Sequence, residues 1–166
     1  MNDNLLFPQA MAHLRALMAA TLEQWALAPL AVLPQGEAAL ADALCAEYLI
    51  DNDTHDLLHR LWRWEAAMQA GRATLAEEFQ AHALLEELLE LFQSLRTAPT
   101  LGKRHDAIVP RWLAGESIAE LAESRGTDEQ RILVLLHEVV RYYQLSNLEA
   151  LRAFLLTIQE YPNDKE

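Results

Sequence analysis

The sequence predicts an all-α protein of about eight helices. Apolar residues recur at helical spacing along nearly the whole chain, and four Ser/Thr-x-x-Glu/Gln segments mark helix starts. Only 5 glycines and 6 prolines interrupt these patterns, and we find no clear strand pattern. Because 52% of the 166 residues are hydrophobic, the chain can bury a core in one compact domain or in two small helical ones.

Two helices are predicted before residue 51. The first begins at Pro8, which suits a first helical turn because the N–H that proline lacks has no helical partner there. Its repeating apolar residues are Met11, Leu14, Leu17, Met18 and Leu22. A proline-interrupted connection covers residues 28–36, and a second helix spans about Glu37 to Ile50.

Polar caps mark the next two helices. The segment DNDT, residues 51–54, caps a helix that runs to Gly71. Thr74 and Glu77 form a capping box at the start of a long helix that ends near Arg96. The apolar face of this long helix comprises Leu84, Leu88, Leu91, Phe92 and Leu95. We therefore expect an amphipathic core helix with a solvated acidic stripe.

A domain boundary is predicted after the long helix. Residues 97–104 combine proline, glycine and a basic pair, which indicates a connection between an acidic N-terminal bundle, 1–96, and a C-terminal portion, 105–166. The alternative is one continuous domain. Three further capping boxes are expected to start helices, namely Ser117 with Glu120, Thr127 with Gln130, and Ser146 with Glu149. The closing helix is expected to stop before Pro162.

The chain is acidic, with a formal net charge of −12 at pH 7. Residues 1–96 contribute −9 and residues 97–166 contribute −3, so nucleic acid, if bound, is expected to meet the second part. An acidic surface suits a basic protein partner, although solubility alone explains the charge equally well. We find no signal-peptide pattern and no apolar run of membrane-spanning length, and the chain has a single cysteine. These observations predict a cytoplasmic protein without membrane contact.

His55 and His59 are the candidates for a metal site. They lie four residues apart and share one helical face, a spacing that can hold a transition-metal ion. However, zinc-protease helices carry glutamate after the first histidine, and this chain has Asp56. Capping and the helix dipole explain Asp51 and Asp53. A plain helix start is therefore the default interpretation of this segment, and we predict no cofactor. The sequence contains no recognisable arrangement of catalytic residues, so we predict no enzyme activity either.

Two kinds of residue are candidates for contact with a protein partner. Trp62 and Trp64 point to different sides of their helix, so at least one is expected in the core while the other is available as an anchor. Core positions for the tryptophans are the favoured interpretation. The acidic candidates are Glu86, Glu87 and Glu90, which suit a partner with a basic surface.

Residues 108–139 have the sequence IVPRWLAGESIAELAESRGTDEQRILVLLHEV. Gly115 precedes a helix that Ser117 caps, and Gly126 lies between that helix and the next. The apolar packing positions are Ile118, Leu121, Ala122, Ile132 and Leu136. In these features the segment resembles the helix-turn-helix of resolvases, transposases and sigma-factor DNA-binding regions. The resemblance implies a three-helix module whose last helix is the recognition helix.

The surface chemistry of this module does not match that of a DNA reader. Asp128 and Glu129 lie at the start of the recognition helix, where carboxylates are repelled by phosphates. Apolar residues cover about half of the helix, which favours contact with other helices or with a protein partner. Basic residues, including Lys103 and Arg104, nevertheless cluster in sequence around the motif. The candidate nucleic-acid contacts are Arg111, Arg125, Gln130, Arg131, His137 and Arg141.

These observations favour a non-catalytic helical interaction protein, meaning an adaptor, a regulator or a small subunit of a larger assembly, for which nucleic-acid processing is one option. The first alternative is a helix-turn-helix DNA-binding regulator, with a homodimer formed through the N-terminal helices. The second alternative is an acidic inhibitor that mimics DNA, which requires carboxylates spaced like phosphates.

Overall fold

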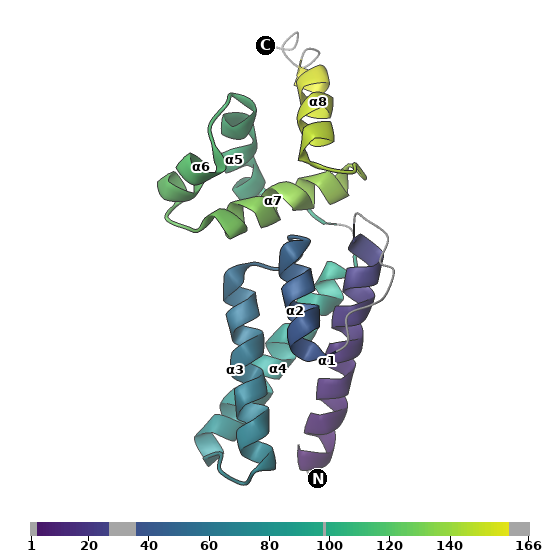
Figure 1. The fold of residues 1–166 in the computed structure, drawn as a ribbon, viewed down its shortest axis with the longest axis vertical. Coiled ribbons are helices and arrows are strands. Elements are labelled where there is room, and N and C mark those ends of the chain that lie inside the picture. The colour runs from purple at the N-terminus through teal and green to yellow at the C-terminus, as the bar shows by residue number, and fades with distance from the viewer. Residues whose placement is uncertain (1–2, 27–35, 98, 160–166) are drawn as a thin grey trace. The chain divides into compact units, whose positions relative to one another are not determined.

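The computed structural model describes residues 3–26, 36–97 and 99–159. Within these ranges the chain forms eight α-helices and no strand, which confirms the predicted all-α fold. The chain divides into two compact units, residues 1–97 and 98–166. Helices α1 to α4 belong to the first unit and α5 to α8 belong to the second (Figure 1).

The first unit is a four-helix arrangement around one apolar core. Its helices are α1 (Asp3–Trp25), α2 (Glu37–Ala46), α3 (Asn52–Gln69) and α4 (Leu75–Leu95). Helix α1 packs against α4 and α2. Helix α3 packs against α2 and against α4, and α3 and α4 run antiparallel (Figure 1). The largest fully buried side chains of this core are Met11, Leu14, Met18, Leu22, Leu44, Leu58, Leu61, Leu88 and Phe92.

Helix α1 begins at Asp3, so the predicted start at Pro8 is wrong. Pro8 lies inside the helix and removes one backbone hydrogen bond, worth about 0.5–1.5 kcal/mol. Phe7 just before it is buried and meets the His82 ring edge-on at 4.8 Å between centroids. Burying such a side chain contributes about 1.5–3 kcal/mol, which outweighs the lost hydrogen bond. The predicted connection at 28–36 lies almost entirely outside the described residues.

Helix α2 ends at Ala46, four residues before the predicted end at Ile50. Tyr48 adopts a left-handed backbone with φ of 58°, and the Leu49 N–H donates to the Leu44 carbonyl at 2.9 Å. This pattern closes the helix as a Schellman motif. Leu49 and Ile50 are buried in the core although neither is helical. Leu49 and Ile50 therefore belong to the core but not to the predicted helix.

Two of the four predicted capping boxes are confirmed. The Thr74 hydroxyl accepts from the Glu77 N–H at 3.1 Å, and the Glu77 carboxylate accepts from the Thr74 N–H at 2.8 Å. Ser117 and Glu120 make the same reciprocal pair at 3.1 and 2.9 Å. The hydrogen bond to Ser117 lowers the pKa of the Glu120 carboxyl, because it favours the ionised form.

The other two caps lie one residue later than predicted. Asp128, not Thr127, caps α7, and its carboxylate accepts from the backbone N–H three residues on at 2.8 Å. Asn147, not Ser146, accepts in the same way before α8, also at 2.8 Å. Aspartate and asparagine outrank threonine as caps and equal serine, so the neighbouring residue takes the position.

The second unit places α5, α6 and α7 against one another. Helices α5 (Lys103–Leu113), α6 (Ile118–Arg125) and α7 (Glu129–Tyr142) are followed by α8 (Leu148–Gln159), which packs on α5 and α7 (Figure 1). The core comprises Ile108, Trp112, Leu121, Ala122, Ile132, Leu135, Leu136, Val139, Val140, Leu151 and Leu155. The predicted end of the last helix, before Pro162, lies outside the described residues.

We expect Thr74→Ala to lower the free energy of unfolding by about 1 kcal/mol, because the Glu77 N–H loses its acceptor at the start of α4. Thr74→Ser keeps a hydroxyl oxygen at this position and should remain close to the wild type. Chemical denaturation followed by far-UV circular dichroism measures both variants. Equal stability of Thr74→Ala and wild type would contradict the importance of this cap.

Candidate functional site

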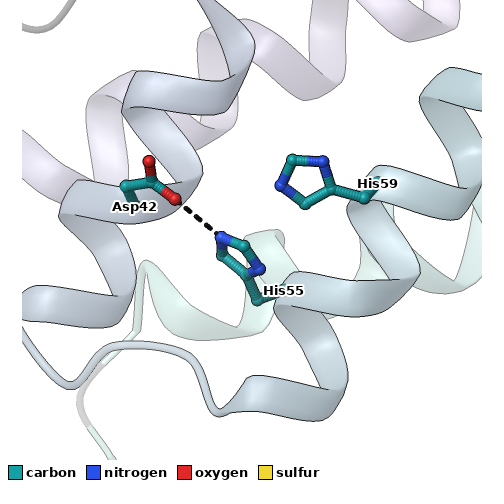
Figure 2. Close-up of side chains that lie close together, drawn as sticks. All are labelled: Asp42, His55 and His59. Carbon is teal, nitrogen blue, oxygen red and sulfur yellow. Dashed lines mark hydrogen bonds and ion pairs between the residues drawn. The ribbon is translucent and has the colours of Figure 1, made fainter.

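Three side chains that can ligate a metal meet on the first unit (Figure 2). His55 and His59 lie on α3, and Asp42 lies on α2. Their ligating atoms are all within 4.8 Å of one another. His55 Nε2 donates to Asp42 Oδ1 at 2.8 Å, and the two imidazole rings are 4.6 Å apart between centroids. The arrangement offers two nitrogen donors and one oxygen donor toward a common point.

Local structure on both helices positions this cluster. Asp51 caps α3 by accepting from the Thr54 N–H at 2.9 Å, which fixes where the helix begins. The i, i+4 spacing then places His55 and His59 on one face of α3, one turn apart. Asp42 is well exposed and the two histidines are half-buried, so solvent reaches the cluster.

The sequence analysis named the two histidines but missed Asp42. Histidines on one helix are recognisable from their spacing, whereas Asp42 comes from a different helix and is separated from His55 by the α2–α3 turn. No sequence spacing identifies such a partner, because it depends on how two helices pack.

Trp62 borders the cluster. Its ring meets the His59 ring edge-on at 5.0 Å between centroids. Its indole N–H is buried and has no hydrogen-bond partner within the described ranges, a cost of about 1–3 kcal/mol for a buried donor. Trp62 and Trp64 are both half-buried and pack against the first core, so neither is a freely exposed anchor.

The acidic candidates all lie on the exposed face of α4. Glu86, Glu87 and Glu90 are exposed, and none has an ion-pair partner among the residues that the structure describes. The same helix carries two exposed apolar side chains that the sequence analysis missed, Leu75 at 70% and Phe79 at 68% exposure. They line a surface hollow of about 250 Å³ together with Glu78 and His82.

In the second unit a buried histidine joins α5 to α7. His105 Nδ1 accepts from the Gly102 N–H at 3.0 Å, so the ring proton is on Nε2. His105 Nε2 donates to the Glu138 carboxylate at 2.7 Å. Both ring nitrogens therefore form hydrogen bonds, and His105 holds α5 against α7.

Three of the nucleic-acid candidates are held by their surroundings. Arg111 forms a double hydrogen bond to Glu116, at 2.6 and 2.7 Å, and this bonding raises the pKa of its guanidinium. His137 is buried and donates from Nδ1 to the Leu133 carbonyl at 2.8 Å. Arg141 is 7% exposed; burial lowers the pKa of its guanidinium, and the Glu138 carboxylate opposes that shift.

Two other candidates share one part of the surface. Arg125 and Arg131 line a hollow of about 130 Å³ together with Arg104, over a floor that includes Ile108 and Ile132. Arginine side chains from α5, α6 and α7 thus line one depression. This hollow can bind an anionic group.

The remaining residues at the start of α7 are less favourable for phosphate. Gln130 is half-buried and Glu129 is exposed. Asp128 uses its carboxylate to cap the helix, so its negative charge stays fixed at that end.

No protein-family model matches this chain, and no curated protein and no solved structure matches it either. Among the helices of the described residues, none is both long and apolar enough to cross a membrane.

We expect Glu138→Ala to lower the free energy of unfolding by about 1–3 kcal/mol more than Glu138→Gln does. Both variants remove the charge beside Arg141, but only glutamine keeps an acceptor for the buried His105 N–H. Thermal and urea denaturation of the two variants give this difference directly. If the variants were equally stable, the His105 contact would contribute nothing to the packing of α5 on α7.

Proposed function

We propose that this chain is a non-catalytic helical interaction protein, an adaptor or regulator, and that the exposed face of α4 binds a basic protein segment. One observation carries the proposal. The two most exposed large hydrophobic side chains of the described residues, Leu75 and Phe79, belong to the same face as the acidic residues Glu86 and Glu90.

Helical geometry supports a continuous surface on α4. At 100° per residue, Leu75, Phe79, Glu86 and Glu90 fall within a sector of about 60°, and Glu87 flanks them. The sector extends about 22 Å along the helix axis, at 1.5 Å per residue. A partner segment therefore meets an apolar anchor at one end and a row of carboxylates beyond it. We call this surface the α4 face.

The chemistry of the α4 face specifies the partner. An aromatic side chain beside a hollow is typical of a binding anchor, since a few buried aromatic contacts carry most of the affinity at interfaces. Carboxylates without ion-pair partners within the described part of the chain attract lysine and arginine, which raises the association rate and sets the orientation of the partner. The partner is thus a segment with cationic residues and one apolar anchor.

We expect Glu86→Gln, Glu87→Gln and Glu90→Gln together to weaken partner binding by about tenfold or more, because each removes a charge but keeps the side-chain size. A matched control carries Glu23→Gln, Glu123→Gln and Glu149→Gln, which change the net charge equally at exposed positions elsewhere. The full chain and both variants are used for affinity capture with mass spectrometry, and the recovered partner is then titrated in purified form at several salt concentrations.

The proposal requires a partner with a basic surface that binds the wild type and the control but not the α4 variant. Phe79→Ala should weaken the same complex without altering its salt dependence. Equal recovery with both triple variants, or no partner at all, would overturn the proposal. Competition by duplex DNA for the partner's surface would identify the protein as an acidic inhibitor that mimics DNA.

A DNA-binding regulator is the second candidate, and the hollow lined by Arg104, Arg125 and Arg131 favours it. Arg125 and Arg131 belong to the segment that resembles a helix-turn-helix, and Arg104 lies at the start of α5, whose second half belongs to that segment. Asp128 and Glu129 lie next to them and reduce the attraction for phosphate.

If this module binds DNA, Arg104→Ala with Arg125→Ala should weaken binding to duplex uniformly across sequences and reduce the salt slope by about 2. Arg60→Ala with Arg72→Ala is the control, since both arginines are exposed in the first unit. Fluorescence anisotropy with a labelled duplex at about 50 mM and 200 mM salt measures the affinity and the slope. No binding at the lower salt concentration excludes this second function.

A further inference from the structure

We propose that Asp42, His55 and His59 form a binding site for one divalent transition-metal ion of the class that includes zinc. The site lies on α2 and α3, whereas the partner surface proposed above lies on α4. The two proposals therefore involve different residues and can fail independently.

The geometry of the three side chains is close to that of a metal site. Ligand atoms around a tetrahedral zinc ion lie about 3.3 Å apart when the bonds are 2.0–2.1 Å. The three ligating atoms here are within 4.8 Å of one another, and one pair is already at 2.8 Å. Small rotations of exposed or half-buried side chains bring all three to bonding distance, and Figure 2 shows them converging from two helices.

In the structure, a hydrogen bond joins His55 Nε2 to Asp42 Oδ1, two atoms that a bound metal ion would bridge. His55 Nε2 carries the proton of this hydrogen bond. When Nε2 binds a metal ion, the imidazole stays neutral by carrying its proton on Nδ1 instead. The Asp42 carboxylate then binds the metal ion in place of the His55 N–H. The metal ion would therefore link α2 to α3 where the hydrogen bond links them now.

A simple contact between α2 and α3 does not account for the cluster. An ion pair with Asp42 needs only one histidine, and His55 already provides it. The second imidazole lies 4.6 Å from the first and has no hydrogen-bond or ion-pair partner among the described residues. His59 is therefore the side chain that a metal site explains and an ion pair leaves unexplained.

The donor set selects the class of ion. Two imidazole nitrogens and one carboxylate suit zinc, cobalt, nickel or copper, whereas calcium and magnesium need mainly oxygen ligands. Solvent reaches the cluster through the exposed Asp42, so water completes the coordination. The acidic first half of the chain, with a net charge of −9, also raises the local concentration of cations.

The experiment titrates the full chain, free of any polyhistidine tag, with Zn²⁺ by isothermal calorimetry and with Co²⁺ by visible absorption. We expect one equivalent of each ion to bind. His59→Ala should weaken binding by more than about 100-fold, exceeding the 10- to 100-fold effect of changing an outer-shell residue. His13→Ala is the matched control, because His13 is an exposed histidine on α1. It should bind as the wild type does.

Asp42→Asn distinguishes a three-ligand site from a pair of surface histidines. Asp42 is exposed, so this variant should fold, which circular dichroism verifies. We expect weaker binding of Zn²⁺ and a changed Co²⁺ spectrum. Zn²⁺ affinity equal to that of the wild type would overturn the three-ligand site. Absence of saturable binding by the wild type, or equal binding by His59→Ala and His13→Ala, would overturn the metal site altogether.

Trp62 provides an independent signal from the same location. Its ring contacts the His59 ring, so Cu²⁺ bound at the cluster should quench its fluorescence. Trp62→Phe should abolish most of the metal-dependent quenching, although Trp25, Trp64 and Trp112 remain. Metal-dependent quenching that is as large in Trp62→Phe as in the wild type would place the bound ion elsewhere and contradict the proposal.

Discussion

The turn between α2 and α3 is the constraint on which the candidate metal cluster depends. Tyr48 adopts a left-handed backbone, which costs about 1–2 kcal/mol for a residue other than glycine. Burial of Leu49 and Ile50 directly after it contributes about 1.5–3 kcal/mol for each side chain, so the core more than offsets the strain. Because this turn ends α2 early and Asp51 then caps α3, the two helices meet in the register that brings Asp42 to His55.

Helix α3 connects this register to the core of the first unit. Leu58 and Leu61 are fully buried, which fixes the rotation of α3 about its own axis. With that rotation fixed, His55 and His59 lie at the edge of the buried face, next to α2. Arg15 on α1 also links these helices, because it forms ion pairs with Glu37 on α2 and Glu65 on α3. Burial raises the pKa of the Glu65 carboxyl, and Arg15 opposes that shift.

The sequence was sufficient wherever a feature depends on neighbouring residues. Helical periodicity predicted the all-α fold, and the boxes at Thr74 and Ser117 are present because each needs only residues three positions apart. The sequence was insufficient for features that depend on packing between helices. Nothing local shows that Tyr48 ends a helix, that Asp42 meets His55, or that Phe79 stays exposed on a helix whose other aromatic residue, Phe92, is fully buried. These features arise from contacts between elements, which a single helix pattern does not contain.

The same packing argument determines how metal binding relates to folding. A classical zinc finger has too small a core to fold without its ion, so the binding energy of the metal is also its folding energy. The described part of the first unit buries 18 hydrophobic side chains in one core, and backbone hydrogen bonds close the α2–α3 turn. The cluster is thus already assembled in the folded chain. An ion that binds there adds stability according to its concentration and affinity, and it leaves the α4 face intact as a separate surface.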